Sequence, residues 1–219
     1  MAQDNICRNP ETPSFCGLTE EEISTHCRTK KYGDFTLTGA VAPSYDLVIV
    51  PENGFRQKPT VCCCCGCTIP FITISASKEI LFDLFLDLVS ALNSVVDVVI
   101  ILYENHNKKS CERRRDDIDI ATLLSILQEF EENLLGDGCL EVAVAREIPP
   151  VEIQLDDHKL IQIWHYQHIP NFIELMTKYG LKEKPEMYFI TEAEHVHSSS
   201  EDSEKKFYEL ASRLSAGEI

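Results

Sequence analysis

The residues of this 219-residue chain with the clearest chemical pattern are cysteines that stand almost side by side. Two overlapping C-x-x-C pairs are formed by Cys62 with Cys65 and Cys64 with Cys67. Closely spaced thiolates suit a soft metal ion, and a structural zinc ion takes four tetrahedral ligands. One pair would need two further ligands, for which the first part of the chain offers Cys7, Cys16, Cys27 and His26. The pattern therefore predicts a cysteine-ligated structural zinc site.

Two other interpretations of the cysteine run stay open. A thiol redox site would use Cys65 and Cys67, and it needs a thiolate of lowered pKa, usually at a helix N-terminus. Residues 68–72 are typical of a strand, so that source of activation is missing. Alternatively, the cysteines are small apolar residues that enter a buried strand and do no chemistry.

A second pattern is the pair His195 and His197, separated by one residue. In a strand, residues two apart share a face, so both imidazoles would project together and could bind zinc, iron or nickel. A catalytic site needs a third ligand, which a predicted hairpin would supply if it neighbours this strand: His165, His168, Asp156, Asp157 or His158. Glu194 or Asp157 would then be the general base of a metal-assisted hydrolase. If the strand ends before His195, these residues instead form a polar turn.

One basic cluster consists of Lys108, Lys109, Arg113, Arg114 and Arg115. We expect it in a loop that leaves the carboxyl end of a strand, where open α/β sheets often bind ligands. Such a loop would hold a small anionic ligand. The alternative is a solvated loop whose charges are balanced, because Glu112, Asp116 and Asp117 adjoin it.

Composition divides the chain into two parts. Residues 1–67 hold eight of the ten cysteines and many prolines and glycines. We expect strands there at 34–38 and 45–50, and a short helix at 20–27 that begins after Thr19 as its N-cap. This Cys-rich segment can bury little apolar surface alone, so it should pack on the second part, residues 68–219.

The second part begins with a regular alternation of strand and helix patterns. A buried strand at 71–74, a helix that begins after Ser77 and a buried strand at 96–103 follow in the order of a βαβ unit. That order predicts a parallel pair of strands. Residues 104–115 are expected to form the loop before a second helix, which begins at Asp117 or Asp119 and which Gly136 helps to end.

The rest of the chain favours a layered fold. Further elements are expected as a strand at 140–145, a β-hairpin of 151–155 with 160–165, a helix after Pro170, a strand at 186–196 and a helix at 201–214. This order predicts an α/β domain, or a mixed α+β one, in which helices cover a mixed sheet and an irregular Cys-rich segment precedes it.

The charge of the chain restricts its partners. Thirty-six acidic residues against 20 basic ones give a formal net charge of −16, which repels nucleic acid and anionic membrane surfaces. The longest apolar stretch is interrupted by Asp83, Asp87 and Asp97, which argues against a membrane span. Residues 1–5 have neither a basic start nor an apolar run, so we expect a cytoplasmic protein.

The sequence favours a non-catalytic binding or regulatory domain, with a small ligand or a protein as its partner and a structural zinc ion bound by cysteines. Two alternatives stay open. One is a metal-assisted hydrolase that uses His195 and His197, and the other is a thiol redox protein that uses Cys65 and Cys67.

Overall fold

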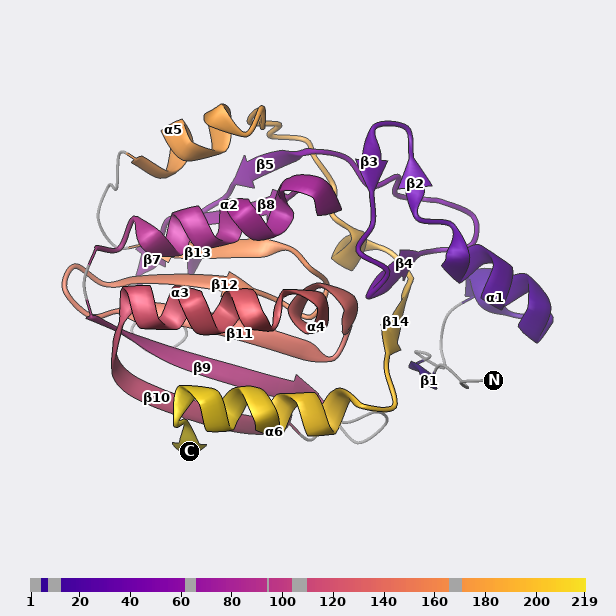
Figure 1. The fold of residues 1–219 in the computed structure, drawn as a ribbon. Helices are drawn as coiled ribbons and strands as arrows, with labels where there is room; N and C mark the ends of the chain where they lie inside the picture. Colours follow the sequence, from indigo (N-terminus) through magenta and orange to yellow (C-terminus); the bar gives the residue numbers. More distant parts are fainter. Residues whose placement is uncertain (1–4, 8–12, 62–65, 94, 104–109, 166–170) are drawn as a thin grey trace.

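An eight-stranded antiparallel sheet forms the centre of the structure (Figure 1). In spatial order its strands are β15 (Gly217–Glu218), β10 (Ser110–Asp119), β9 (Val95–Tyr103), β11 (Leu140–Arg146), β12 (Val151–Leu155), β13 (Ile161–His165), β8 (Phe71–Ser75) and β5 (Gly54–Gln57). This computed structural model describes residues 5–7, 13–61, 66–93, 95–103, 110–165 and 171–219.

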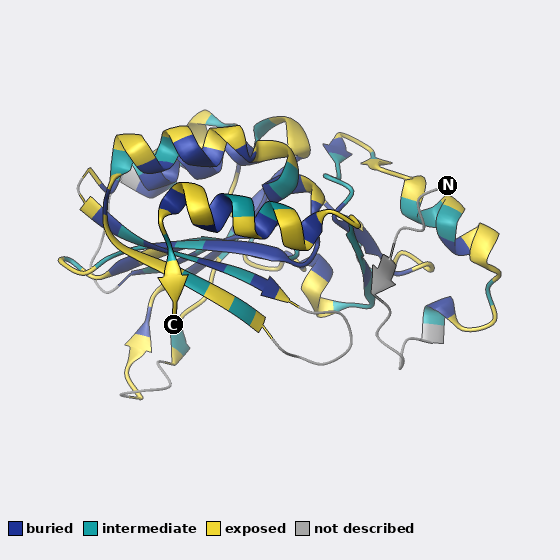
Figure 2. Ribbon diagram, turned by 60° about the horizontal axis from the view of Figure 1, so that its bottom comes forward, coloured by how far each residue is buried: buried dark blue, intermediate teal, exposed yellow. Residues whose placement is uncertain are grey.

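Helices cover one face of this sheet (Figures 1 and 2). They are α2 (Lys78–Ser90), α3 (Ile120–Glu129), α4 (Glu131–Gly136), α5 (Asn171–Lys178) and α6 (Ser203–Leu214). Alternate strand residues such as Val98 and Ile100 of β9 are fully buried in the same continuous core as Leu84 and Leu88 of α2. The fold is therefore mixed α+β, one of the two classes that the order of elements predicted. Among the helices that the structure describes, none is long and apolar enough to cross a membrane.

Several local predictions are confirmed. Helix α1 (Glu20–Arg28) begins with a capping box, in which Thr19 and Glu22 each bind the other's backbone N–H. Helix α3 begins after Asp119, whose carboxylate accepts a hydrogen bond from the Thr122 N–H at 3.1 Å. Strands β12 and β13 form the predicted hairpin. Helical periodicity, cap residues and hairpin turns are short-range signals, which explains why they were visible in the sequence.

The predicted parallel pair of strands is wrong. Strands β8 and β9 point in the same direction, but β11, β12 and β13 lie between them, and both neighbours of β9 run antiparallel to it. The predicted loop at 104–115 is wrong over residues 110–115, which belong to β10, and residues 104–109 lie outside the described part of the chain. This polar strand lies near the sheet edge and pairs with β9 through its backbone, which the side-chain pattern does not reveal.

Two predicted strands in other parts of the chain are displaced. Residues 45–50 form turns and bends, with Leu47 at a φ of 53° that a strand does not allow. Strand β14 covers only His195–Ser199, because the short 3₁₀ helix η2 (Ile190–Glu192) precedes it. The predicted strand at 186–196 is therefore replaced by a shorter one that begins where the histidine pair begins.

Strand β14 is the middle strand of a second, small sheet. It pairs with β1 (Asn5–Cys7) on one side and β4 (Val41–Pro43) on the other, both antiparallel. The two parts of the chain are thus interleaved, because β14 joins two N-terminal strands while β5 forms one edge of the large sheet. Gly138 joins the two sheets: its N–H donates to Ser198 at 2.7 Å, and a Cβ there would lie 2.3 Å from the Ala40 oxygen.

Candidate metal centre

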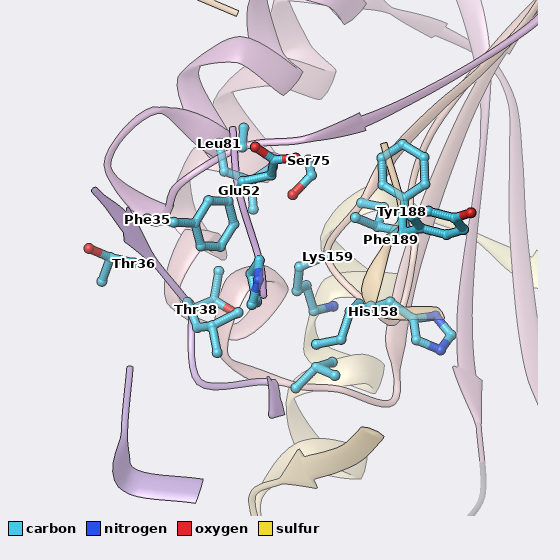
Figure 3. A pocket seen from close by; sticks show the side chains of 16 residues that line it. Phe35, Thr36, Thr38, Glu52, Ser75, Leu81, His158, Lys159, Tyr188 and Phe189 are labelled. Atoms are coloured by element: carbon cyan, nitrogen blue, oxygen red, sulfur yellow. The ribbon is translucent and has the colours of Figure 1, made fainter. Parts of the chain in front are cut away.

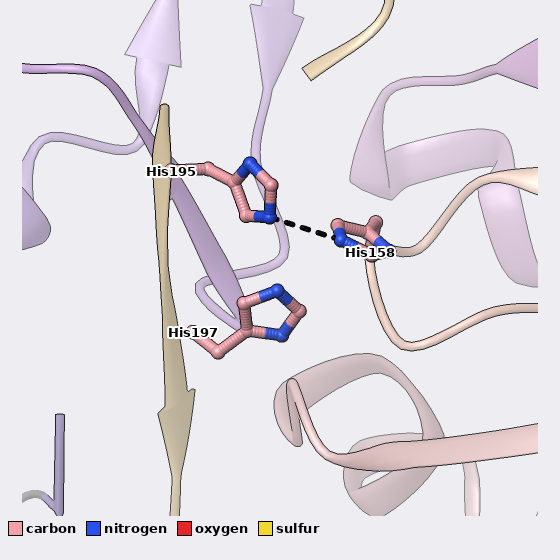
Figure 4. Close-up of side chains that lie close together, drawn as sticks. All are labelled: His158, His195 and His197. Carbon is pink, nitrogen blue, oxygen red and sulfur yellow. Dashed lines mark hydrogen bonds between the residues drawn. The ribbon is translucent and has the colours of Figure 1, made fainter. Parts of the chain in front are cut away.

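Three histidines meet where the small sheet faces the tip of the β12–β13 hairpin (Figure 4). His195 and His197 come from β14, and His158 comes from the hairpin turn. The His158 Nε2 lies 3.0 Å from the His195 Nε2, and the His158 and His197 ring centroids lie 4.6 Å apart. One ring nitrogen from each residue lies within 4.8 Å of the other two. We call these three residues the histidine cluster.

The packing of β14 aims its histidines at the hairpin. Val196 lies between them in sequence and is 3% exposed, because it packs against Phe15 and against Ile23 of α1. Since neighbouring strand residues face opposite ways, His195 and His197 must point away from α1. A hydrophobic contact with the N-terminal segment thus orients both imidazoles.

The hairpin turn that carries His158 is held by buried polar contacts. The Lys159 N–H donates to the Asp156 backbone oxygen at 3.0 Å, and Lys159 adopts a left-handed φ of 62°. The Asp156 carboxylate accepts the Leu160 N–H at 2.8 Å. The buried Lys159 Nζ donates to the Leu140 oxygen of β11 at 2.6 Å. These contacts tie the turn to the sheet, so the position of His158 is defined by rigid structure.

Each histidine uses its Nδ1 for another contact. The His195 Nδ1 lies 2.8 Å from the Ala193 oxygen, and the His197 Nδ1 contacts the Gly138 oxygen. The His158 Nδ1 lies 2.7 Å from an Asp157 carboxylate oxygen. A neutral imidazole that donates from Nδ1 carries its lone pair on Nε2, which is the usual arrangement of a metal-bound histidine.

The pKa values of the three imidazoles are shifted in different directions. Burial lowers the pKa of His197 to about 4 and also lowers the pKa of His195, so both are neutral near pH 7. Burial acts in the same direction on His158, but the hydrogen bond and charge of Asp157 outweigh it and raise its pKa. A proton on the His158 Nε2 then donates to the His195 Nε2, and a bound cation would take the place of that proton.

Buried charged residues and the half-buried Asp157 surround the cluster at this end of the large sheet. We call Glu141, Asp156, Asp157 and Lys159 the polar end of the sheet. Burial raises the pKa of Glu141 to about 7 and that of Asp156 to about 6, and nearby carboxylates add to both shifts. Four carboxyl groups, these three and Asp137, act on the one buried ammonium group of Lys159, and this environment favours a cation.

The residues predicted as general bases have different surroundings. Asp157 lies in the site, but its carboxylate accepts the His158 Nδ1–H and so orients a ligand. Glu194 accepts the Ser14 N–H at 2.9 Å, and it precedes His195, so strand alternation turns it away from the cluster. His165 is buried in β13, outside the cluster, and the prediction for His168 falls outside the described residues.

The predicted cysteine ligands fall in several places. Cys62, Cys64 and Cys65 lie outside the described residues. Cys67 and Cys16 are exposed, and Cys27 is half-buried on α1. The backbone of Cys7 belongs to β1, opposite His197 in the strand register. In the part of the chain that the structure describes, the groups of side chains close enough to share a metal ion contain histidine and aspartate, without cysteine.

The predicted anion loop also takes another form. Arg113, Arg114 and Arg115 follow one another along β10, so their side chains alternate between the sheet faces, and Lys108 lies outside the described residues. Arg113 pairs with Glu218 at 2.9 Å, and Arg114 pairs with Asp97 at 2.9 Å. The arginines therefore do not converge on one anion, and carboxylates already neutralise two of them.

The fold and site define an α+β protein with a three-histidine cluster between two sheets, backed by buried carboxyl groups. Comparison of the chain with protein-family models, with curated proteins and with solved structures finds no match.

Proposed function

We propose that the protein binds one divalent transition-metal ion, with zinc(II) as the best fit, through the Nε2 atoms of His158, His195 and His197. The proposed role of the ion is to activate water in a hydrolytic reaction. The observation that carries this proposal is the convergence of three imidazoles whose Nδ1 atoms are all engaged elsewhere. Converging ligands with oriented second nitrogens are typical of metal sites.

The spacing of His158 and His195 suits zinc with little adjustment, and all three ligand atoms lie within 4.8 Å of one another. Zinc–nitrogen bonds are about 2.0–2.1 Å long, so two tetrahedral imidazole nitrogens lie about 3.3 Å apart. The His158 and His195 Nε2 atoms are 3.0 Å apart, so they need to separate by only about 0.3 Å. Asp157 supports the site from behind His158, in the carboxylate–histidine–metal arrangement that orients many ligands.

Access to solvent favours a catalytic centre over a closed structural one. The His158 side chain is 20% exposed and that of His197 is 16% exposed. Structural zinc sites are closed by four protein ligands, whereas catalytic sites have three and leave the fourth position to water. Three histidines that water can reach therefore support metal-assisted hydrolysis over a structural zinc ion in a binding domain.

The residues around the proposed metal ion have different roles. When bound, zinc lowers the pKa of its water to about 7, which supplies hydroxide at neutral pH. The neutral His195 and His197 provide lone pairs without first losing a proton, and Asp157 fixes the ring of His158. In the proposed hydrolysis the water oxygen bonds to the electrophilic carbon of the substrate. The leaving group departs with a proton, and the second proton passes to solvent.

Competition between the chelator-stripped protein and a chromophoric chelator for zinc(II) tests metal binding. We expect one equivalent of zinc(II) to bind. Each of His158→Ala, His195→Ala and His197→Ala should weaken binding by more than about 100-fold, because loss of a ligand should cost more than loss of a residue that only orients a ligand. His26→Ala is the matched control, because His26 lies on α1, outside the cluster, where its Nε2 contacts the Pro43 oxygen of β4. If His26→Ala weakens binding as strongly as the cluster variants, the assignment is wrong.

The reaction class needs a separate assay. We expect the zinc-loaded protein to hydrolyse a neutral activated ester, p-nitrophenyl acetate, faster than the stripped protein does. His197→Ala should lose this difference, because the ion is no longer held. Zinc binding without any zinc-dependent hydrolysis would retain the metal site and remove the hydrolytic role.

A further inference from the structure

The hollows beside the large sheet differ greatly in size. The one beside the hairpin turn, shown in Figure 3, has a volume of about 30 Å³ and a wall that includes the buried Lys159. That volume has room for about two water molecules. A hollow elsewhere on the sheet has a volume of about 560 Å³, which is enough for a side chain and part of the backbone of another molecule.

This larger hollow, which we call the open-face groove, lies on the sheet face that the helices leave uncovered (Figure 2). Its floor is a row of residues that stand directly opposite one another on neighbouring strands: Asp97, Ala145, Glu152 and Trp164. Residues next to this row in sequence, such as Val96 and Ile153, are buried in the helix-covered core, so the row faces away from the helices. Two short paired strands, β6 (Thr60–Val61) and β7 (Thr68–Ile69), form one wall.

The open-face groove is separate from the histidine cluster. Glu152 lies near the start of β12, whereas Asp156 directly follows its end. Four residues of a strand span about 13 Å, and His158 lies farther along the turn. The groove and the cluster thus lie at opposite ends of the β12–β13 hairpin, and a ligand can bind in the groove whether or not a metal ion is held.

The floor of the groove combines an aromatic ring with an unbalanced carboxylate. Trp164 is half-buried, and its ring lies 4.9 Å from that of Phe71, measured between centroids. Glu152, directly opposite Trp164, is exposed and forms no ion pair with any residue that the structure describes. Asp97, by contrast, pairs with Arg114 at 2.9 Å. An indole ring and a carboxylate side by side attract a cation, because both present negative charge to it.

Ala145 leaves space for such a cation. It stands in register between Asp97 and Glu152, so the Cα atoms of these two acids lie about 10 Å apart across its methyl group. Arg146 also lines the groove, but its guanidinium already donates to the Leu92 oxygen at 2.6 Å. The space above Ala145 therefore lies beside a carboxylate that no cation neutralises.

The groove is open and long, which suits an extended chain. It continues into a second hollow of about 510 Å³, with which it shares five lining residues: Asp97, Arg114, Ala145, Arg146 and Glu147. That hollow adds the exposed carboxylates of Asp116 and Asp117. Pockets for small molecules enclose most of their ligand, whereas this groove does not. The net charge of −16 attracts a basic partner from a distance.

We propose that the open-face groove binds an extended basic peptide segment of a partner protein, with one lysine or arginine side chain over Ala145, between Glu152 and the Trp164 ring. Further basic side chains of the segment pair with Asp116, Asp117 and other acids of the adjoining hollow. The partner is thus recognised by positive charges spaced along an extended chain.

The fluorescence of Trp164 tests the proposal, because it is the one tryptophan of the chain. The probes are two short blocked peptides, one of alternating lysine and alanine and the other of alternating glutamate and alanine. Each is titrated into the chelator-stripped full chain at physiological salt, with binding measured by calorimetry and occupancy of the groove by Trp164 emission. We expect the lysine peptide to bind and to shift the emission, and the glutamate peptide to do neither.

Variants of the floor and a matched control locate the binding. Glu152→Gln should weaken binding of the lysine peptide at least about fivefold, because the carboxylate beside Trp164 loses its charge. Ala145→Lys should abolish the emission shift, because its own ammonium group takes the space. Glu132→Gln changes the net charge as Glu152→Gln does, but at an exposed position of α4, and should leave binding unchanged.

Other outcomes overturn the proposal. Equal weakening in Glu152→Gln and Glu132→Gln would mean that net charge alone attracts the peptide. Absence of binding, or binding by calorimetry without a change in Trp164 emission, would show that the groove is not the site. If methylammonium binds as tightly as the lysine peptide, the groove holds a small organic cation and the peptide assignment is wrong. None of these results depends on the metal site, because the metal is removed.

Discussion

The helix-covered core and the polar end of the sheet are built from the same strands but by different means. In the core, Leu84 and Leu88 of α2 pack on fully buried valines and isoleucines, and shape and apolar area provide the stability. At the polar end, Glu141 in strand β11 and Asp156, which directly follows strand β12, are also buried. Burying ionisable groups costs stability, and such costly arrangements are concentrated at functional sites, so this difference directs attention to the histidine cluster.

The largest expected effect tests the core. Leu88→Ala should lower the free energy of unfolding by about 2 to 5 kcal/mol, because it loses transfer energy and leaves a cavity in a fully buried site. Urea unfolding followed by circular dichroism measures this change. Asp83→Ala on the exposed side of the same helix is the control and should be nearly neutral. A loss below about 0.5 kcal/mol at Leu88 would contradict the packing described for α2.

A smaller effect, of opposite sign, is expected at the polar end. The pKa of Glu141 is about 7 in the folded protein against an ordinary value of 4.5, so the folded state keeps a proton that the unfolded chain loses. The free energy of unfolding should therefore fall as the pH rises from about 4.5 to about 7. Glu141→Gln removes this loss and should stabilise the protein at pH 8 by up to about 3 kcal/mol.

The pH comparison contains its own control. At pH values below about 4.5 the carboxyl is protonated in both states, so Glu141→Gln and the wild type should unfold at similar urea concentrations. The measurement is made with a chelator present, so that metal binding does not contribute. A stability difference that is the same at low and high pH would show that burial of the Glu141 charge is not its cause.

The next prediction concerns metal affinity. Asp157→Asn should weaken zinc(II) binding about 10- to 100-fold, because an amide orients and polarises His158 less well than a carboxylate. The matched control is Asp116→Asn, in the sequence pair Asp116-Asp117. The Asp116 side chain is exposed and pairs with Arg114. Chelator competition measures both variants. Equal losses in the two would remove the distinction between the buried and the exposed aspartate pair.

The smallest effect is expected for a surface ion pair. Arg213 of α6 lies 2.6 Å from Glu129 of α3, and both side chains are about half exposed. Arg213→Ala should change the free energy of unfolding by less than about 1 kcal/mol, because solvent screens the pair. Thermal unfolding at low and high salt checks this value. A loss as large as that at Leu88 would mean that charges on the helix layer matter as much as its packing.

The parts of the fold that the sequence predicted depend on local signals. Leu84 and Leu88 follow the helical repeat, and the predicted N-cap Thr19 directly precedes the helix that it begins. The sequence analysis missed strand β10 because its side chains are mostly polar and show no strand pattern. It forms a strand because its backbone pairs with β9. The neighbours of β8 in the sheet were also hidden, since they come from distant parts of the chain.

The candidate site was predictable only in part. The spacing of His195 and His197 indicated a shared face, and the strand that carries them confirms this geometry. His158 was one of five possible third ligands, because nothing local in the sequence says which turn meets β14. That contact depends on Val196 packing against α1 and on Gly138 joining the two sheets. Such tertiary contacts leave no periodic signal in the sequence.

The most direct test of the account is X-ray absorption spectroscopy at the zinc edge of the protein loaded with one equivalent of zinc. The account predicts a first shell of nitrogen and oxygen atoms at about 2.0–2.1 Å, with the outer-shell scattering of three imidazole rings. A shell of sulfur atoms at about 2.3 Å would contradict it, because the metal would then be bound by the cysteines and the histidine cluster would not be its site.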